Sequence, residues 1–310
     1  MKNINLNRRK AVSAYTHSHP DIDEENEVIS NWRKENEKIE LDLLLEAIYQ
    51  KYHYDFKDYS RAHLKRRLMY RMRAAELESL SHLQHKILYD RSFFETLLLD
   101  FSINVTEMFR DPSFYLAVRK KVIPRLKKYP FIKIWHAGCS TGEEVYSMAI
   151  LLKEEGLYEK TQIYATDFNT LVLQRAKQAI YPIDMIKEYT LNYQKAGGTN
   201  SFADYYTAKY HSVILEPSLK ERIVFADHNL VTDGVFGEMN MILCRNVLIY
   251  FTKKLQNRVI KLFMDSLTPS GFLCLGSKES LQFSEYFSYF NPYIEKEKIY
   301  QYQIIPGEKE

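Results

Sequence analysis

The chain has 310 residues, of which 45% are hydrophobic and 27% charged, with a formal net charge of +3 at pH 7. This composition is ordinary for a folded globular protein. No apolar run reaches the roughly 18 residues that a membrane-spanning helix needs. The start, MKNINLNRRK, has no apolar stretch after its basic residues. We therefore expect a cytoplasmic protein with no secretory signal and no membrane insertion.

Cysteine usage and net charge exclude further classes. Cys139, Cys244 and Cys274 form no Cys-x-x-Cys pair, which argues against a disulfide framework and a structural zinc site. A net charge of +3 is too small to indicate nucleic-acid binding by itself. We expect no metal and no nucleic-acid partner.

The first third of the chain has helical patterns. Residues 1–38 are polar with little apolar periodicity, which predicts a flexible or partly helical arm. Amphipathic patterns then follow one another and predict an all-helical domain over residues 39–102. A further helix is expected after Asp111, a suitable N-cap, with Pro112 in its first position.

After Pro130 short apolar segments alternate with amphipathic ones. Strands are expected at 131–138, 162–167, 239–246 and 271–276, and helices at 140–156, 169–180 and 252–267. This order predicts an α/β fold with a parallel, doubly wound, Rossmann-like sheet within a domain of residues 103–310. Residues 182–225, with a Gly-Gly turn and alternating aromatic or β-branched residues, predict a small antiparallel β insertion. The tail, 289–305, is expected to close the sheet with a hairpin.

The first predicted strand of this domain ends in a turn of small residues that includes Gly138 and Gly142. Such a turn lets a ligand approach the backbone at a helix N-terminus. Asp167 ends the next strand, where a carboxylate can bind ribose hydroxyls. The P-loop lysine is missing, and Glu143 and Glu144 suit a cationic ligand such as S-adenosylmethionine better than a pyrophosphate. Alternatively, the glycines only shape a turn and the glutamates favour the helix N-terminus.

Taken together, six segments resemble the CheR family of chemotaxis-type protein-glutamate O-methyltransferases. They are NVTEMFRDP (104–112), AGCSTGEEVYS (137–147), ATDFN (165–169), FADHNL (225–230), LCRNVLIYF (243–251) and LGSKESL (275–281). The likeness covers about residues 40–305. It implies a helical N-terminal domain, a methyltransferase domain with a β insertion, S-adenosylhomocysteine as product, and glutamates of a signalling, chemoreceptor-like protein as the target.

The resemblance also implies residue roles. The cofactor-binding positions are Asn104, Thr106, Arg110, Glu143 or Glu144, Asp167, Asn229, Leu230, Arg245 and Asn246. We favour Glu144 over Glu143. Tyr250 is expected close to the transferred methyl group, together with Arg110, and these two are the candidate catalytic residues. This chain departs from the family at Met108 and Val145, usually Phe and Pro. It also lacks the histidine of a frequent Gly-His-Ser-Glu segment at 276–279, which leaves a role for that histidine in doubt.

The residues fit this chemistry independently of the resemblance. A glutamate is already anionic at pH 7, so methyl transfer to it needs alignment and removal of water but no general base. A guanidinium can hold a carboxylate by two hydrogen bonds, and a phenol can orient it. Arg110 and Tyr250 can supply these groups. Taken alone, each could also be an ordinary surface arginine or strand-end aromatic.

The segment 61–73 is strongly basic. On a helix its apolar stripe is Leu64, Leu68 and Met72. Arg66 and Arg73 lie on one flank of that stripe, and Arg67 and Arg71 on the other. The family uses a basic helix near an acidic receptor surface, so we predict that these four arginines dock an acidic helical partner. Alternatively, some extend over the core or pair with acids, and nucleic-acid binding is a weaker alternative.

Two other functions stay open from the sequence. The chain could be a cofactor-binding signalling module that acts by protein contact without turnover, although Arg110 and Tyr250 favour an enzyme. It could also methylate a small carboxylic acid or a nucleic acid, although the basic helical domain and the β insertion favour a protein substrate. We expect a monomer.

Overall fold

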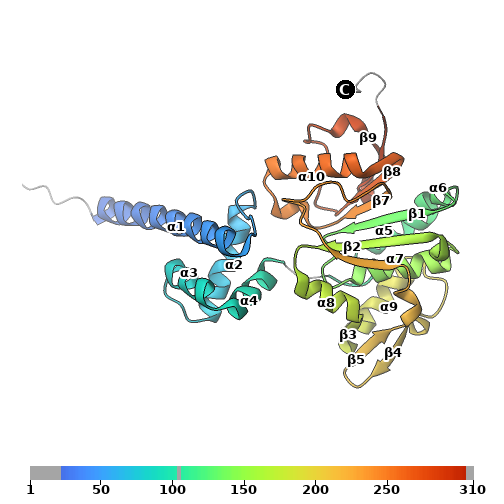
Figure 1. Cartoon of the computed structure of the whole chain (residues 1–310), viewed down its shortest axis with the longest axis horizontal. Coiled ribbons are helices and arrows are strands. Elements are labelled where there is room, and N and C mark those ends of the chain that lie inside the picture. Colours follow the sequence, from blue (N-terminus) through green and yellow to red (C-terminus); the bar gives the residue numbers. More distant parts are fainter. Residues whose placement is uncertain (1–21, 103–105, 305–310) are drawn as a thin grey trace, which may run out of the picture.

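The computed structural model describes residues 22–102 and 106–304, with side chains in the first helix from Lys34 onward. Figure 1 shows a helical part formed by the amino-terminal helices, followed by a larger α/β part. Of the amino-terminal arm predicted over residues 1–38, residues 1–21 lie outside the described residues and residues 22–38 form the start of the first helix. Within the described residues, no helix combines the length and apolar character needed to cross a membrane.

The helical part consists of α1 (Ile22–Tyr52), α2 (Arg61–Ala74), α3 (Leu80–Tyr89) and α4 (Arg91–Phe101). Two of these helices begin at N-cap residues: the side chains of Ser79 and Asp90 accept hydrogen bonds from backbone N–H groups in the first turns of α3 and α4. The first helix begins at Ile22, well before the amphipathic pattern that starts at residue 39. Figure 1 shows this amino-terminal stretch extending beyond α2–α4.

The α/β part is built on a seven-stranded sheet with the order β6-β2-β1-β7-β8-β10-β9. Its strands are β1 (Ile132–Ala137), β2 (Thr161–Asp167), β6 (Ile223–Asp227), β7 (Met239–Cys244), β8 (Leu267–Leu275), β9 (Phe290–Ile294) and β10 (Ile299–Tyr302). The strands from β6 to β8 are parallel. The hairpin of β9 and β10 joins antiparallel to β8. The predicted doubly wound sheet and its closing hairpin are confirmed.

Helices cover both faces of this sheet. They are α5 (Pro112–Ala117), a π-helical turn (Val118–Val122), α6 (Ile123–Leu126), α7 (Glu143–Glu154), α8 (Thr170–Gln178), α9 (Ile186–Lys195) and α10 (Lys253–Ser266). Ile134 and Met241 point into a core shared with α5–α7. Trp135 and Ile242, the next residues along, point into a core shared with α10 and α1–α4. The helical part therefore shares a hydrophobic cluster with one side of the α/β part. It contacts that part at the carboxyl ends of the strands, where Tyr59 forms a β-bridge with Phe251 and Phe56 meets the ring of Phe168.

The β insertion is a three-stranded antiparallel sheet of β3 (Ile180–Pro182), β5 (Ser212–Leu215) and β4 (Tyr206–Lys209), in that order. Its bounds differ from the predicted 182–225. Helix α8 ends earlier than expected, because Ala179 is left-handed (φ 55°) and releases the chain into β3. At the other end, β6 pairs in parallel with β2 and belongs to the main sheet. In an edge strand with one exposed face, apolar and polar residues alternate as they do in an antiparallel strand. The sequence therefore could not distinguish β6 from the strands of the insertion.

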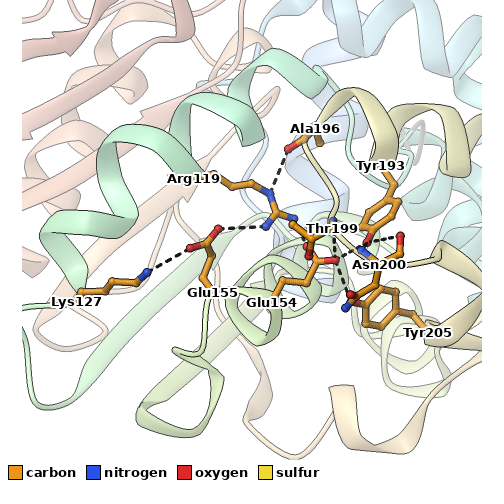
Figure 2. A network of polar contacts seen from close by, with 9 residues as sticks. All are labelled: Arg119, Lys127, Glu154, Glu155, Tyr193, Ala196, Thr199, Asn200 and Tyr205. Carbon is orange, nitrogen blue, oxygen red and sulfur yellow. Dashed lines mark hydrogen bonds and ion pairs between the residues drawn. The ribbon is translucent and has the colours of Figure 1, made fainter.

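A buried polar network joins the insertion to the main domain (Figure 2). Arg119, on the π-helical turn, forms ion pairs with Glu154 and Glu155 at the end of α7 and donates to Ala196 O at 3.1 Å. Glu154 also accepts hydrogen bonds from two tyrosines of the insertion segment, Tyr193 and Tyr205. The side chains of Arg119 and Glu154 are 6% and 1% exposed. The network thus fixes the insertion against α7 through charges that have almost no contact with water.

Candidate active site

A pocket opens at the carboxyl ends of β1, β2 and β7, where the helical part meets the sheet. Its wall combines aromatic side chains such as Tyr59 and Phe168 with a few polar groups, which is the kind of lining that suits a small-molecule ligand. Nine of the predicted site residues line it: Thr106, Arg110, Glu144, Asp167, Asn229, Leu230, Arg245, Asn246 and Tyr250. Asn104 lies outside the described residues, and Glu143 does not line the pocket.

The turn between β1 and α7 forms one wall. Gly138 is left-handed (φ +82°), and a Cβ there would lie 2.7 Å from Val247 Cγ2. Its N–H and that of Cys139 both donate to Thr166 O at 2.8 Å. These contacts hold the turn against the end of β2, so the tip of α7 and the end of β2 face the same space.

Asp167 is the carboxylate at the end of β2. It is 7% exposed and accepts hydrogen bonds from the backbone N–H groups of Ser140 and Asn169 at 2.9 and 3.0 Å. Burial raises the pKa of Asp167 to about 6, although these backbone donors oppose the shift. The backbone of Phe168 also donates to this carboxylate, and since an ionised carboxylate has about four acceptor sites, it can still accept a hydroxyl donor from a ligand.

Glu144 is held from two sides on the first turn of α7. His136 Nδ1 lies 2.9 Å from Glu144 Oε1, and Arg245 Nη1 donates to Glu144 Oε2 at 2.9 Å. Burial alone would raise the pKa of Glu144, but the hydrogen bond from His136 and the charge of Arg245 lower it below its ordinary value. The pocket therefore contains a carboxylate that stays ionised.

Arg245 connects Glu144 to the start of α5. Its Nη2 donates to Asp111 Oδ2 at 2.6 Å, and its guanidinium stacks 4.1 Å from the Phe114 ring centroid. Asp111 stands at the N-cap position of α5 with Pro112 in the first position of the helix, as predicted, but its side chain makes no cap hydrogen bond and its backbone is left-handed (φ 57°). The ion pair with Arg245, across 134 residues of sequence, takes the carboxylate that a local cap would use.

Glu143 differs from its neighbour. Its carboxylate accepts a hydrogen bond from Thr141 Oγ1 at 2.7 Å and is 6% exposed. Burial raises the pKa of Glu143 to about 7. Since Glu144 lines the pocket and Glu143 does not, the geometry favours Glu144 as the cofactor ligand.

Tyr250 stands where the pocket meets the helical part. Its carbonyl oxygen accepts a hydrogen bond from Ser60 N at 2.8 Å, and Tyr59 forms a β-bridge with Phe251. The ring of His63, on α2, meets the Tyr250 ring edge-on with centroids 5.1 Å apart. Burial raises the pKa of Tyr250, although positive charge from Arg67 and Arg110 opposes the shift. The phenol is therefore protonated at neutral pH.

The predicted docking arginines on α2 differ in their surroundings. Arg71 forms a bidentate ion pair with Asp100 on α4 at 2.6 and 2.8 Å, with 18% of its side chain exposed. Arg66 and Arg73 are exposed, and Arg67 is half-buried. Arg71 thus packs α2 against α4, and the charges of Arg66 and Arg67 remain at the side of Tyr250.

Sequence reasoning missed two residues that hold the site. His136 is fully buried beside Glu144. Glu279 is 5% exposed and accepts backbone hydrogen bonds from the segment after β7. Neither residue gave a periodic signal, and only the packing of separate segments brings them beside Glu144 and Asn246, which line the pocket.

The pocket can be tested for fit to S-adenosylmethionine. Asp167 has free lone pairs for ribose hydroxyls, and Glu144 offers a negative charge for a cationic ligand. A side chain at Gly138 would collide with Val247, so the turn beside these two carboxylates requires glycine. Phe168 and Tyr59 add aromatic surface for a base. The residues present fit this cofactor. The described residues contain no group of His, Cys, Asp and Glu arranged to hold a metal ion.

Comparison with known proteins agrees with this fold and pocket. The family model for the CheR methyltransferase SAM-binding domain matches residues 104–294, and that for the CheR methyltransferase all-alpha domain matches residues 39–102. The protein is therefore a methyltransferase with an S-adenosylmethionine-binding domain. More particularly, the chain belongs to the CheR family.

Several relatives support the same assignment. The chain is 53% identical to a putative methyltransferase, Cher3, of Pseudomonas putida over 86% of its own length and 97% of the relative's. It is 33% identical to a chemotaxis protein methyltransferase of Listeria innocua, covering 60% of this chain and 71% of that one. It is 31% identical to chemotaxis protein methyltransferase 2 of Pseudomonas aeruginosa, covering 72% and 77%.

Proposed function

We propose that this protein transfers the methyl group of S-adenosylmethionine to glutamate side chains of a signalling protein and forms glutamate methyl esters. The observation that carries the proposal is the convergence of Arg110 and Tyr250 on the pocket that also contains Asp167 and Glu144. Family membership and the relatives described as chemotaxis protein methyltransferases support it.

The cofactor supplies a methyl group on a sulfonium, which a carboxylate oxygen takes as the carbon–sulfur bond breaks and its electron pair stays on sulfur. The protein's task is to bind and align. Asp167 would hold the ribose hydroxyls, and Glu144 would hold the cationic part of the cofactor. Arg110 orients the anionic target carboxylate, and the Tyr250 phenol positions it. Tyr59 and Phe251, which also line the pocket, exclude water from the space between the cofactor and the target carboxylate.

We propose further that the target lies on an acidic, helical partner that docks on α2. Arg66 is exposed on this helix, and the adjacent Arg67 is close enough to Tyr250 to oppose the rise in its pKa. A partner that binds the exposed side of α2 would therefore contact these two arginines next to the pocket. Arg73 lies exposed further along the helix. We leave Arg71 out of this surface because Asp100 occupies its guanidinium.

Incubation with cofactor labelled on the methyl group and helical receptor fragments tests the proposal. We expect label on the fragment that is released by mild base, because methyl esters hydrolyse there and methylated amines do not. Binding of the cofactor without any transfer would instead favour a signalling module that acts by contact. Transfer to nucleic acid or to a small acid, but not to a protein fragment, would also contradict the proposal.

A further inference from the structure

The segment that links β7 to Tyr250 is held by a single carboxylate. Glu279 Oε2 accepts hydrogen bonds from Gly276 N and Asn246 N at 2.6 and 2.9 Å. Glu279 Oε1 accepts from Val247 N and Ile249 N at 2.9 and 3.3 Å. Four backbone N–H groups therefore converge on one side chain that is 5% exposed.

These donors come from the ends of two neighbouring strands. Gly276 directly follows β8, and 246–249 follow β7. A Cβ at Gly276 would lie 2.7 Å from Asn246 N and 2.8 Å from Glu279 Oε2, so the close approach requires glycine. Asn246 itself is left-handed (φ 62°). Such a backbone conformation persists only where its surroundings fix it.

Tyr250 depends on this segment. Its N–H donates to Val247 O at 3.1 Å, and its carbonyl oxygen accepts from Ser60 N at 2.8 Å. Val247 is in turn held by Glu279. The backbone of Tyr250 is thus fixed on one side by the helical part and on the other by a segment whose N–H groups end on Glu279.

We propose that Glu279 is a positioning residue for the transfer step, because its carboxylate fixes residues 246–249 and through them the place of the Tyr250 ring. The inference rests on the proposed function, in which Tyr250 lies at the transferred methyl group. It also bears on the Gly-Ser-Lys-Glu segment. The position of the missing histidine is Ser277, which is exposed, so in this chain the glutamate of the segment holds the site.

A carboxylate suits this task better than any neutral side chain. Its two oxygens can accept all four N–H groups, whereas a glutamine presents one oxygen and an NH₂ group. In Glu279→Gln, two of the four donors would face another donor. Misplacement of a reacting group by about 1 Å can cost about 100-fold in rate, so we expect kcat to fall between about tenfold and 100-fold.

The matched control is Asn240→Ala. Asn240 lies at the opposite, amino end of β7, is 7% exposed, and accepts a backbone hydrogen bond from Lys133 N at 2.8 Å. Removing the Asn240 side chain leaves the Lys133 N–H without its acceptor, just as Glu279→Gln leaves backbone donors without theirs. The site of this loss is at the end of β7 that lies away from the pocket. A merely structural role for Glu279 predicts the same behaviour for both variants: a lower Tm and an unchanged kcat in folded protein.

Hydrogen exchange in the ligand-free protein gives a readout that does not depend on turnover. We expect the amides of 246–250 to exchange at least tenfold faster in Glu279→Gln and at the wild-type rate in Asn240→Ala. Unchanged exchange in Glu279→Gln would overturn the inference. If that variant does not fold, Glu279→Asp keeps the charge but withdraws it by one methylene, and the same increase in exchange is expected.

A double-mutant cycle with Tyr250→Phe then tests the link to the reaction. If Glu279 acts through Tyr250, Glu279→Gln should lower kcat at least tenfold alone but less than about threefold in the Tyr250→Phe background. An equal loss in both backgrounds would contradict the inference and leave the proposed function intact. A wild-type kcat in Tyr250→Phe alone would contradict the role of Tyr250 in the proposed function.

Discussion

Cofactor affinity should depend on pH through Asp167, as a direct consequence of its burial. In the free protein, burial raises the pKa of this carboxyl to about 6, with a smaller contribution from the negative charge of Asp227. Bound ribose hydroxyls would donate to the remaining lone pairs and favour the charged form. The cofactor should therefore lower this pKa, and affinity should be full above pH 6 and decline as the pH falls below it.

The size of the effect follows from linkage. If the bound cofactor returns the pKa of Asp167 from about 6 to an ordinary value of about 4, the difference of about two units corresponds to ~3 kcal/mol. Binding must then displace a proton at low pH. By this linkage the Kd of S-adenosylhomocysteine should be about tenfold higher at pH 5 than at pH 7. Glu144 adds little to this change, because its pKa is already lowered.

Isothermal titration with S-adenosylhomocysteine between pH 5 and 8 measures this directly. Asp167→Asn should bind about tenfold to 100-fold more weakly at pH 7, since charged hydrogen bonds contribute ~1.5–3 kcal/mol, and should lose the pH dependence. Glu143→Gln is the control, because the pKa of Glu143 is raised to about 7 but its side chain lies outside the pocket. The reasoning fails if the pH dependence persists in Asp167→Asn or disappears in Glu143→Gln.

Three further predictions concern transfer, docking and stability. Tyr250→Phe should lower kcat about tenfold to 100-fold with less than a threefold change in the Kd of S-adenosylhomocysteine, because the phenol contacts the target; parallel losses in both would argue against this. Charge reversal at Arg66 and Arg67 should raise KM for a receptor fragment and leave cofactor affinity unchanged, and equal loss of both would refute docking on α2. Arg119→Met should lower the unfolding free energy by ~3–5 kcal/mol, because it removes the charge that pairs with buried Glu154. Thermal unfolding measures this loss, and cofactor affinity should not change.

The sequence predicted those features of the site that depend on local pattern. The β1–α7 turn and Asp167 each follow an apolar strand, and strand ends in a parallel sheet meet at one edge. Their place in the pocket therefore followed from periodicity and topology. The alternation of strands and helices in the main domain was predictable for the same reason, whereas β6 was assigned to the insertion and belongs to the main sheet. The roles of Arg110 and Tyr250 came from the family resemblance, and both residues line the pocket.

What the sequence could not predict depends on contacts between distant segments. Asp111 is a residue type that favours N-cap positions, but its carboxylate pairs with Arg245 and makes no cap hydrogen bond. Arg71 looked like its basic neighbours until Asp100 was placed beside it. Glu279 has no periodic signal, since its role depends on backbone N–H groups from another strand end. Side-chain partners across a fold are set by packing, which single-sequence patterns do not contain.

Mapping the methylated residue tests the central claim most directly. A receptor fragment would be incubated with the protein and S-adenosylmethionine, digested under acidic conditions that preserve esters, and sequenced by mass spectrometry. The account predicts a methyl ester on one or more glutamates, absent when those glutamates are replaced by alanine and strongly reduced with the Tyr250→Phe protein. Methylation of lysine, arginine or a chain terminus in place of glutamate would contradict it.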